Sequence, residues 1–318
     1  MLSALFIVIL SLVIINIFIP VKYLSSYFGA KGEKPEKGVM RVTFLNVGYS
    51  DCTIVELPDG KVMLIDGGHM YQDGLAIFNY LNRNDIKKID YLVCTSPKEE
   101  HCGRLDEVVK YKTIGKVFMP YVQDSTVTAE FERFSREVTN SKIPTEYCET
   151  GVGEVSDDGK YFFTFLSPTA HDEQGSEYGP LNSDPTDENI DAASAVLWLQ
   201  YGENRLLFMG DVTTGQEQKI VDSYNENPFC YNFDGNAVNL PECNVIKVAH
   251  HGEKEARCAA FYDLVKPEMA IISTDTRANE MDMGVLSDIS NWALSNVYIT
   301  QISGNVTLKV KADSYVMA

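Results

Sequence analysis

Three segments of this sequence combine donor atoms that bind transition metals. They are residues 95–103 (TSPKEEHCG), 208–211 (FMGD) and 248–252 (VAHHG). Each directly follows or ends a short apolar run that reads as a buried strand, and active-site loops commonly follow strand ends in layered α/β folds. Carboxylate oxygens and imidazole nitrogens are zinc ligands. A lone His is more often satisfied by the backbone, but the three segments together predict a metal site.

The elements that must position these segments can be read from the apolar pattern. The turn Pro58-Asp59-Gly60 joins two apolar runs, which predicts a hairpin, and residues 72–84 place Leu75, Phe78 and Leu81 on one helical face. We expect a second hairpin over 193–200 and 205–209, further strands over 89–95, 161–168, 243–249, 269–273, 297–301 and 305–310, and helices over 213–224, 256–265 and 285–293. Two similar halves of strands and helices predict two sheets between helical layers.

Residues 44–68 (FLNVGYSDCTIVELPDGKVMLIDGG) resemble the opening of the metallo-β-lactamase domains of ComEC-type competence proteins, which typically reads FLNVGQGD and then ILIDGG. The later GD and HHGS motifs of that family correspond to residues 210–211 and 250–253, and KPEMAIIS resembles its RPRVAIIS strand. The resemblance covers about residues 39–310. It implies an α/β fold, the four-layer αββα metallo-β-lactamase sandwich, over residues 39–318, and metal-dependent hydrolase chemistry.

The departures from the family pattern fall on the metal ligands. The family motif THPHADHIGG is replaced by TSPKEEHCGR, so the two His that bind one metal become Ser96 and Lys98. Serine is a poor zinc ligand and an ammonium group repels a dication, so that metal is expected to be absent. The family segment NxYGHP corresponds here to TRANEMDMG, residues 276–284, which contains no His. Ligands of the second metal are retained in kind, and the resemblance implies one Zn²⁺ held by Glu100, His101, Asp211 and His251, with no metal as the alternative.

The same alignment assigns catalytic roles to Lys98, His250 and Asp211. Lys98 is expected to place its ammonium group where the missing metal would lie, to pair with Asp211 and to stabilise developing negative charge. His250 is expected to contact the substrate or to move a proton. The implied substrate is a phosphoester or phosphodiester. The competing hypothesis is a pseudoenzyme that acts as an anchored binding module, and the Ser96 and Lys98 replacements motivate it.

Four further residues are weaker candidates. Asp66 is expected to hold a loop near the site. His69 is either a replacement ligand or a surface residue, Cys102 either a ligand or a small packed residue, and Arg104 either a contact to an anionic substrate or a solvated side chain. The Gly-, Ser-, Asp- and Pro-rich stretch 169–191 is either a solvated insertion or a loop that faces substrate or calcium.

The first 21 residues predict a transmembrane anchor, because residues 2–20 carry no charge and approach the length that spans about 30 Å of hydrocarbon. Residues 22–38 read as a linker. A cleaved signal peptide is the alternative, although only Met1 precedes the apolar run. Lys22 favours a cytoplasmic body by the positive-inside rule, whereas the family resemblance favours an extracellular one.

Net charge restricts the partners. The chain of 318 residues carries a formal charge of −18, and its first 37 residues contain four Lys and two Glu, so the body is more acidic still. Such a body repels phosphate backbones, so a small anionic or phosphoester ligand is favoured over a nucleic acid, which the family resemblance leaves as the alternative. None of the seven Cys forms a CxxC pair. Cys230 and Cys243 could form a disulfide outside the cytosol or remain free.

Overall fold

The computed structural model describes residues 25–71, 75–121, 128–168, 190–191, 193–254, 256–275, 282–293 and 296–318. Within these ranges no helix is both long and apolar enough to cross a membrane. The predicted anchor at residues 1–21 lies outside the described residues. Residues 169–189 of the predicted polar loop also lie outside them.

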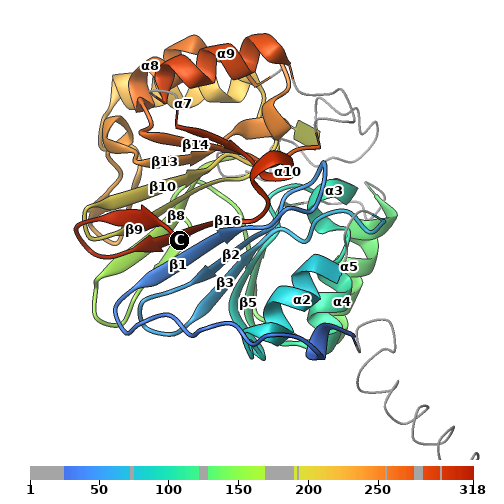
Figure 1. The fold of residues 1–318 in the computed structure, drawn as a ribbon. Coiled ribbons are helices and arrows are strands. Elements are labelled where there is room, and N and C mark those ends of the chain that lie inside the picture. The colour runs from blue at the N-terminus through green and yellow to red at the C-terminus, as the bar shows by residue number, and fades with distance from the viewer. Residues whose placement is uncertain are drawn as a thin grey trace, which may run out of the picture.

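Two sheets form the centre of the described structure (Figure 1). One has eight strands in the order β17-β16-β1-β2-β3-β4-β5-β6. Their bounds are β1 Met40–Phe44, β2 Thr53–Glu56, β3 Val62–Ile65, β4 Lys88–Val93, β5 Thr113–Met119, β6 Thr145–Tyr147, β16 Val306–Val310 and β17 Tyr315–Met317. The predicted hairpin over Pro58-Asp59-Gly60 is confirmed by the antiparallel pairing of β2 with β3.

The second sheet has seven strands in the order β15-β14-β13-β10-β9-β8-β7. Their bounds are β7 Gly153–Val155, β8 Tyr161–Ser167, β9 Val196–Tyr201, β10 Asn204–Phe208, β13 Val245–Lys247, β14 Met269–Ile272 and β15 Val297–Ile299. The second predicted hairpin is confirmed by β9 and β10. A short separate hairpin joins β11 Asn232–Phe233 and β12 Asn236–Ala237.

Helices cover the outer face of each sheet (Figure 1). Against the first sheet lie α2 Leu75–Arg83, α3 Glu99–Cys102, α4 Leu105–Tyr111 and α5 Ala129–Asn140. Against the second lie α7 Thr214–Glu226, α8 Ala259–Val265 and α9 Met283–Trp292. The remaining helical segments are α10 Thr300–Ser303 and the 3-10 turns η2 Leu240–Glu242 and η3 Ala249–Gly252. The predicted α/β sandwich is therefore confirmed, and the predicted strand over 297–301 ends earlier because α10 begins at Thr300.

Three buried apolar clusters hold the four layers together. The alternation in β8 shows how, because Tyr161, Phe163 and Phe165 point into the cluster between the sheets, whereas Phe162 and Leu166 point toward the helices on the outer face. Burying one such side chain contributes about 1.5–3 kcal/mol. A strand that is apolar on both faces is the pattern expected for a sheet covered on both sides.

Strand direction brings several loops to one edge of the sandwich. The strands β3, β4 and β5 run parallel, as do β10, β13 and β14, so each set ends at one sheet edge. Strand β2 runs antiparallel to β3 with Thr53 opposite Ile65, so the residues before β2 lie beside the residues that follow β3. Chemistry at this edge can therefore draw on both kinds of loop.

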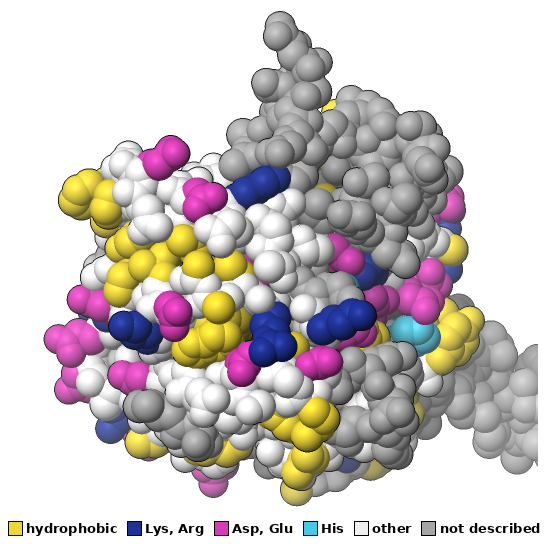
Figure 2. All heavy atoms as spheres, turned by 90° about the horizontal axis from the view of Figure 1, so that it is seen from above, with side chains coloured by type: hydrophobic (Ala, Val, Ile, Leu, Met, Phe, Trp, Pro, Cys, Tyr) yellow, Lys and Arg dark blue, Asp and Glu magenta, His cyan; other side chains and the backbone are white. Residues whose placement is uncertain are grey.

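The surface seen in Figure 2 carries Lys and Arg side chains scattered among Asp and Glu. On this face the positive side chains therefore do not form a continuous patch. All seven cysteines are free, and Cys243 is buried while Cys230 is partly exposed. The predicted alternative of free thiols at these two positions is the one that the structure shows.

Candidate metal centre

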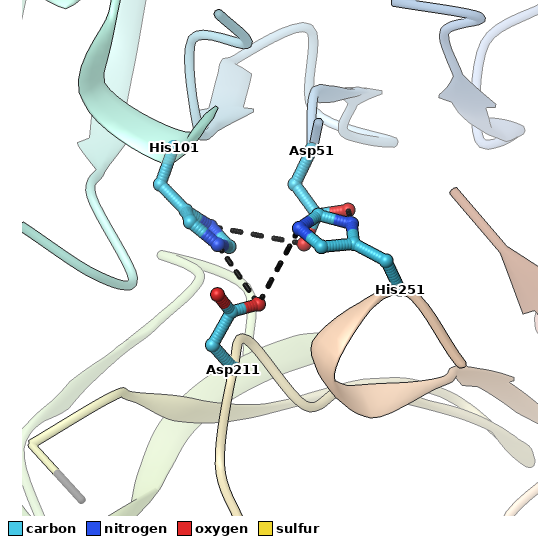
Figure 3. A group of neighbouring side chains, drawn as sticks. All are labelled: Asp51, His101, Asp211 and His251. Atoms are coloured by element: carbon cyan, nitrogen blue, oxygen red, sulfur yellow. Dashed lines mark ion pairs between the residues drawn. The ribbon is translucent and has the colours of Figure 1, made fainter. Parts of the chain in front are cut away.

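Four side chains meet where the two sheets approach each other at this edge (Figure 3). Asp51 precedes β2, His101 lies in α3, Asp211 follows β10, and His251 lies in η3 after β13. One nitrogen or oxygen atom from each lies within 4.8 Å of those from the other three. We call these four residues the central donor group.

Asp211 links the two imidazoles of the central donor group. Its Oδ1 atom lies 2.9 Å from His101 Nε2 and 3.7 Å from His251 Nε2. The carboxylate of Asp51 lies on the other side, with Oδ2 3.7 Å from His101 Nδ1 and Oδ1 3.7 Å from His251 Nδ1. Two carboxylates and two imidazoles therefore surround one small volume.

The donor atoms are buried and lack hydrogen bonds, which is the property that a metal site requires. His101, Asp211 and His251 are fully buried and Asp51 is 4% exposed. Within the described part of the chain, Asp51 Oδ1, His101 Nε2, both oxygens of Asp211 and His251 Nε2 have no hydrogen-bond partner. The ion-pair contacts described above are their main compensation, and coordination to one cation would satisfy these donor atoms together. The residues present thus fit a divalent metal.

Neighbouring groups fix the orientation of both imidazoles. His101 Nδ1 lies 3.0 Å from Asp66 Oδ2, and His251 Nδ1 lies 2.8 Å from the Ser273 carbonyl oxygen. Asp66 is itself held, because the Thr95 backbone N–H and hydroxyl both donate to its carboxylate. A partner on Nδ1 leaves Nε2 directed at the metal, as is usual for histidine ligands.

The electrostatics of the central donor group couple its members. Burial alone would lower the pKa of His101, but the carboxylates of Asp211 and Asp66 raise that pKa well above its ordinary value. Burial would raise the pKa of Asp211, but His101 and His251 hold it well below its usual range. Burial lowers the pKa of His251. Asp211 is therefore ionised, and a proton on His101 competes with any metal.

The backbone at the site adopts unusual conformations. His250 and His251 have φ values of 47° and 53°, and Asp66 has φ 61°. The left-handed region costs an L-residue roughly 1–2 kcal/mol, and such strain concentrates at functional sites. This bend lets the two adjacent histidines point toward different parts of the site.

A second donor group adjoins the first and shares Asp211. It consists of Asp191, Asp211 and His250. The ammonium group of Lys98 lies among them, with Nζ 2.5 Å from Asp191 Oδ1 and 3.6 Å from Asp211 Oδ2. Lys98 thus forms the ion pair with Asp211 that was predicted from the sequence, and it forms a second ion pair with Asp191. We call these four residues the lysine group.

Glu100 does not join the central donor group, which differs from the sequence expectation. Its Oε1 atom lies 3.9 Å from Lys98 Nζ, and its backbone carbonyl accepts a hydrogen bond from Asp51 N–H. This backbone hydrogen bond ties the loop that holds Asp51 to α3, and Asp51 supplies a carboxylate to the group where Glu100 does not.

The weaker candidates lie outside both groups. His69 Nε2 contacts Glu99 Oε1 at 2.9 Å, the Cys102 thiol is buried and donates to the Lys98 carbonyl, and Arg104 donates to the Met70 carbonyl. Asp66 holds His101 and so supports the site in the way that was expected.

Asp51, Asp191 and Lys247 were not singled out from the sequence. Lys247 is buried in β13, and its ammonium group pairs with Asp51 Oδ2. The hairpin signal at Pro58-Asp59-Gly60 could have revealed Asp51, because it places the start of one strand beside the end of the next. Asp191 lies at the end of a polar stretch that gives no comparable signal.

The comparisons with known proteins agree with this fold. Residues 45–274 match the family model described as metallo-beta-lactamase superfamily. The chain is 24% identical over 255 residues to ComE operon protein 3 of Bacillus subtilis (strain 168), which covers 73% of this chain and 28% of that protein. The chain thus corresponds to only a part of that relative.

Two solved structures are also similar. A CmlA beta-hydroxylase E377D mutant superposes with a TM-score of 0.51 at 12% identity, over 88% of this chain and 55% of that one. The CmlA diiron beta-hydroxylase of Streptomyces venezuelae gives a TM-score of 0.47 at 15% identity, with the same coverage of both chains. At such low identity the first likeness supports the fold alone.

Proposed function

Because the chain belongs to the metallo-β-lactamase superfamily, we propose that it is a metal-dependent hydrolase of small phosphoesters or phosphodiesters. The observation that carries this proposal is the convergence of four buried donors without hydrogen bonds. Asp51, His101, Asp211 and His251 would hold one Zn²⁺. When bound, the metal would supply a Lewis acid that polarises an ester oxygen and makes a water more acidic.

Lys98 and His250 supply the remaining chemistry in this proposal. The Lys98 ammonium group lies beside the central donor group and is 12% exposed, so it can neutralise negative charge that develops on a phosphoryl oxygen. His250 Nδ1 has no hydrogen-bond partner among the described residues, and the side chain is 9% exposed. This nitrogen can accept or donate a proton at the edge of the site.

Charge supports a small substrate. The chain has a net charge of −18, which opposes the approach of a polyanion. Locally, Lys98 and a bound dication would attract a single phosphoester group. We therefore favour a small phosphoester over a nucleic acid.

A membrane-anchored location with an extracellular body is part of the proposal. The uncharged apolar residues 2–20 and the similarity to a competence operon protein support it. Alkaline phosphatase fused after residue 318 would test the orientation. Phosphatase activity in intact cells is expected, and an inactive but intact fusion would contradict an extracellular body.

One observation favours a second function, an anchored binding module with a structural metal. The central donor group already contains four protein ligands, and a tetrahedral zinc site with four protein ligands is closed to substrate. All four side chains are also buried. In this alternative the metal stabilises the fold and the surface binds a partner.

Metal analysis combined with a phosphoester assay distinguishes these functions. We would measure zinc per chain and hydrolysis of bis(p-nitrophenyl) phosphate and p-nitrophenyl phosphate for the wild type and His101→Ala, with His69→Ala as a control outside both groups. Bound zinc and turnover that are both lost in His101→Ala support the hydrolase. Bound zinc without turnover of either ester supports the binding module. A wild type that binds no divalent metal contradicts both.

A further inference from the structure

The lysine group has the composition of a metal site that is already filled by a cation of the protein. We infer that Asp191, Asp211 and His250 form a second divalent-metal site, that the Lys98 ammonium group occupies it, and that removing this group opens it to Zn²⁺. The inference concerns the residues beside the proposed zinc and shares only Asp211 with the central donor group.

The three donors of the lysine group are of the kinds that bind zinc. Asp191 and Asp211 contribute carboxylates and His250 contributes an imidazole, and one ligand atom from each lies within 4.8 Å of the others. Two oxygens and one nitrogen are ligands that Zn²⁺ accepts. Asp211 is fully buried, Asp191 is 4% exposed and His250 is 7% exposed, so water does not compensate these groups well.

Lys98 compensates the carboxylates of this group but not its imidazole. Asp211 Oδ2, Asp191 Oδ1 and His250 Nδ1 are buried and have no hydrogen-bond partner within the described residues. The Lys98 ammonium group satisfies the carboxylates through ion pairs, at 2.5 Å from Asp191 and 3.6 Å from Asp211. His250 Nδ1 receives no such contact and lies 3.9 Å from Asp191 Oδ2. An ammonium group cannot coordinate this nitrogen in the way that a metal does.

The Lys98 ammonium group compensates only part of the negative charge of Asp191 and Asp211. Two buried carboxylates with a single ammonium group leave one negative charge, which Asp211 shares with the histidines of the central donor group. A dication that entered beside Lys98 would be repelled at close range. Without the ammonium group, Asp191 would lose its cation at 2.5 Å and Asp211 would keep only its contacts with the histidines, so the group would attract a metal.

Zinc binding to the full-length chain tests the inference directly. We would dialyse the wild type, Lys98→Ala, Lys98→Arg and the double variant Lys98→Ala with Asp191→Ala against Zn²⁺, and count bound zinc by elemental analysis. Lys98→Ala should bind about one more Zn²⁺ than the wild type, because three ligands become available. Lys98→Arg retains the cation and should match the wild type, and the double variant should lose the added ion.

A stability measurement keeps the test decisive if Lys98→Ala folds poorly without metal. Because a metal that binds only the folded chain stabilises it, Zn²⁺ should raise the Tm of Lys98→Ala by more than that of the wild type. Equal zinc counts in Lys98→Ala and the wild type would overturn the inference. So would a Lys98→Ala chain that gains no more from Zn²⁺ than the wild type does, or that remains unfolded with it.

These outcomes separate this inference from the proposed function. The wild-type zinc count tests the central donor group, whereas the difference between the wild type and Lys98→Ala tests the lysine group. A wild type without zinc and a Lys98→Ala variant with zinc would contradict the proposed function and support the inference.

Discussion

The central donor group and the lysine group share one carboxylate but obtain their positive charge differently. Asp211 Oδ1 faces His101 and His251, and its Oδ2 faces Lys98. Both groups combine buried carboxylates with imidazole. In the lysine group a covalently attached ammonium group balances the carboxylates, whereas the central donor group depends on protons or an acquired metal.

This difference shows how one site can keep its charge balance after losing ligands. By the resemblance drawn from the sequence, Ser96 and Lys98 replace two metal-binding histidines, so Lys98 supplies a permanent charge and no metal ligand. A permanent ammonium group holds the neighbouring carboxylates in place whatever the metal supply. The central donor group should therefore respond to metal removal, and the lysine group should not.

The largest effect is expected from Asp211→Asn, because it disrupts both groups at once. The change removes the negative charge that Lys98, His101 and His251 share, and it places an amide NH2 group where a carboxylate oxygen lies. Breaking a buried ion pair from one side costs about 3–5 kcal/mol. Urea unfolding should show a loss of this size, and zinc analysis should show no bound metal. A variant with wild-type stability and metal content would contradict the shared role of Asp211.

Asp51→Asn should remove metal from the central donor group alone. Its matched control is Glu100→Gln, because Glu100 is the ligand implied by the family pattern and lies outside the group. Asp51 also balances the buried Lys247, so a loss of about 3–5 kcal/mol is expected as well. Isothermal titration with Zn²⁺ should show binding in Glu100→Gln and none in Asp51→Asn. The reverse pattern would restore Glu100 as the ligand.

Asp66→Asn should weaken metal binding without abolishing it. Asp66 contacts His101 Nδ1 at 3.0 Å and does not belong to the donor group. Loss of such an outer partner typically lowers metal affinity by about 10–100-fold. A competition titration against a zinc chelator measures this change. If the affinity is unchanged, the orientation of His101 does not depend on Asp66.

Glu217 contrasts with the carboxylates of both groups. It is buried, and no contact with a cationic side chain is seen in the described structure. It lies in α7, one oxygen accepts from Cys258 N–H, and burial raises its pKa to about 8. The folded chain therefore keeps a proton that the unfolded chain releases above the ordinary pKa of 4.5. Its contribution to stability is thus complete at low pH and is lost as the pH rises toward about 8.

Glu217→Gln should remove this pH dependence. The free energy of unfolding of the wild type should fall, relative to the variant, by at most about 1.4 kcal/mol per pH unit in that window. Urea unfolding at pH 6 and pH 8 measures the difference, and Glu226→Gln, at an exposed glutamate of the same helix, serves as the control. Parallel pH profiles for wild type and Glu217→Gln would show that Glu217 is ionised in the folded chain.

Most strands and helices could be predicted from the sequence, because the patterns that indicate them involve residues close together in the chain. The turn at Pro58-Asp59-Gly60 and the alternation in residues 161–168 depend on neighbours along the chain. Helix ends were harder to predict, since α8 begins at Ala259, whereas the predicted range began at Ala256.

The site was accessible only where a motif and a strand end coincide. His101, Asp211 and His251 follow strands within recognisable motifs, and the structure brings them together. Whether they bind metal remains a prediction. Asp51 precedes its strand, and Asp191 ends a polar stretch without periodicity, so their positions depend on tertiary packing that no local pattern records. Glu100 occupies the motif position, but its carboxylate lies beside Lys98 and outside the group of four donors, so its role as a ligand stays a prediction.

The central donor group also has a consequence for the order of folding. Its members range from Asp51 to His251 and follow or precede strands of both sheets, so the site forms only after the two halves of the chain have docked. Contacts between such distant residues form slowly, because the intervening chain must first lose conformational entropy. A metal that needs all four donors would bind the docked state alone and slow its opening. The ion would thus hold the two halves of the chain together, and it would have to dissociate before they separate during unfolding.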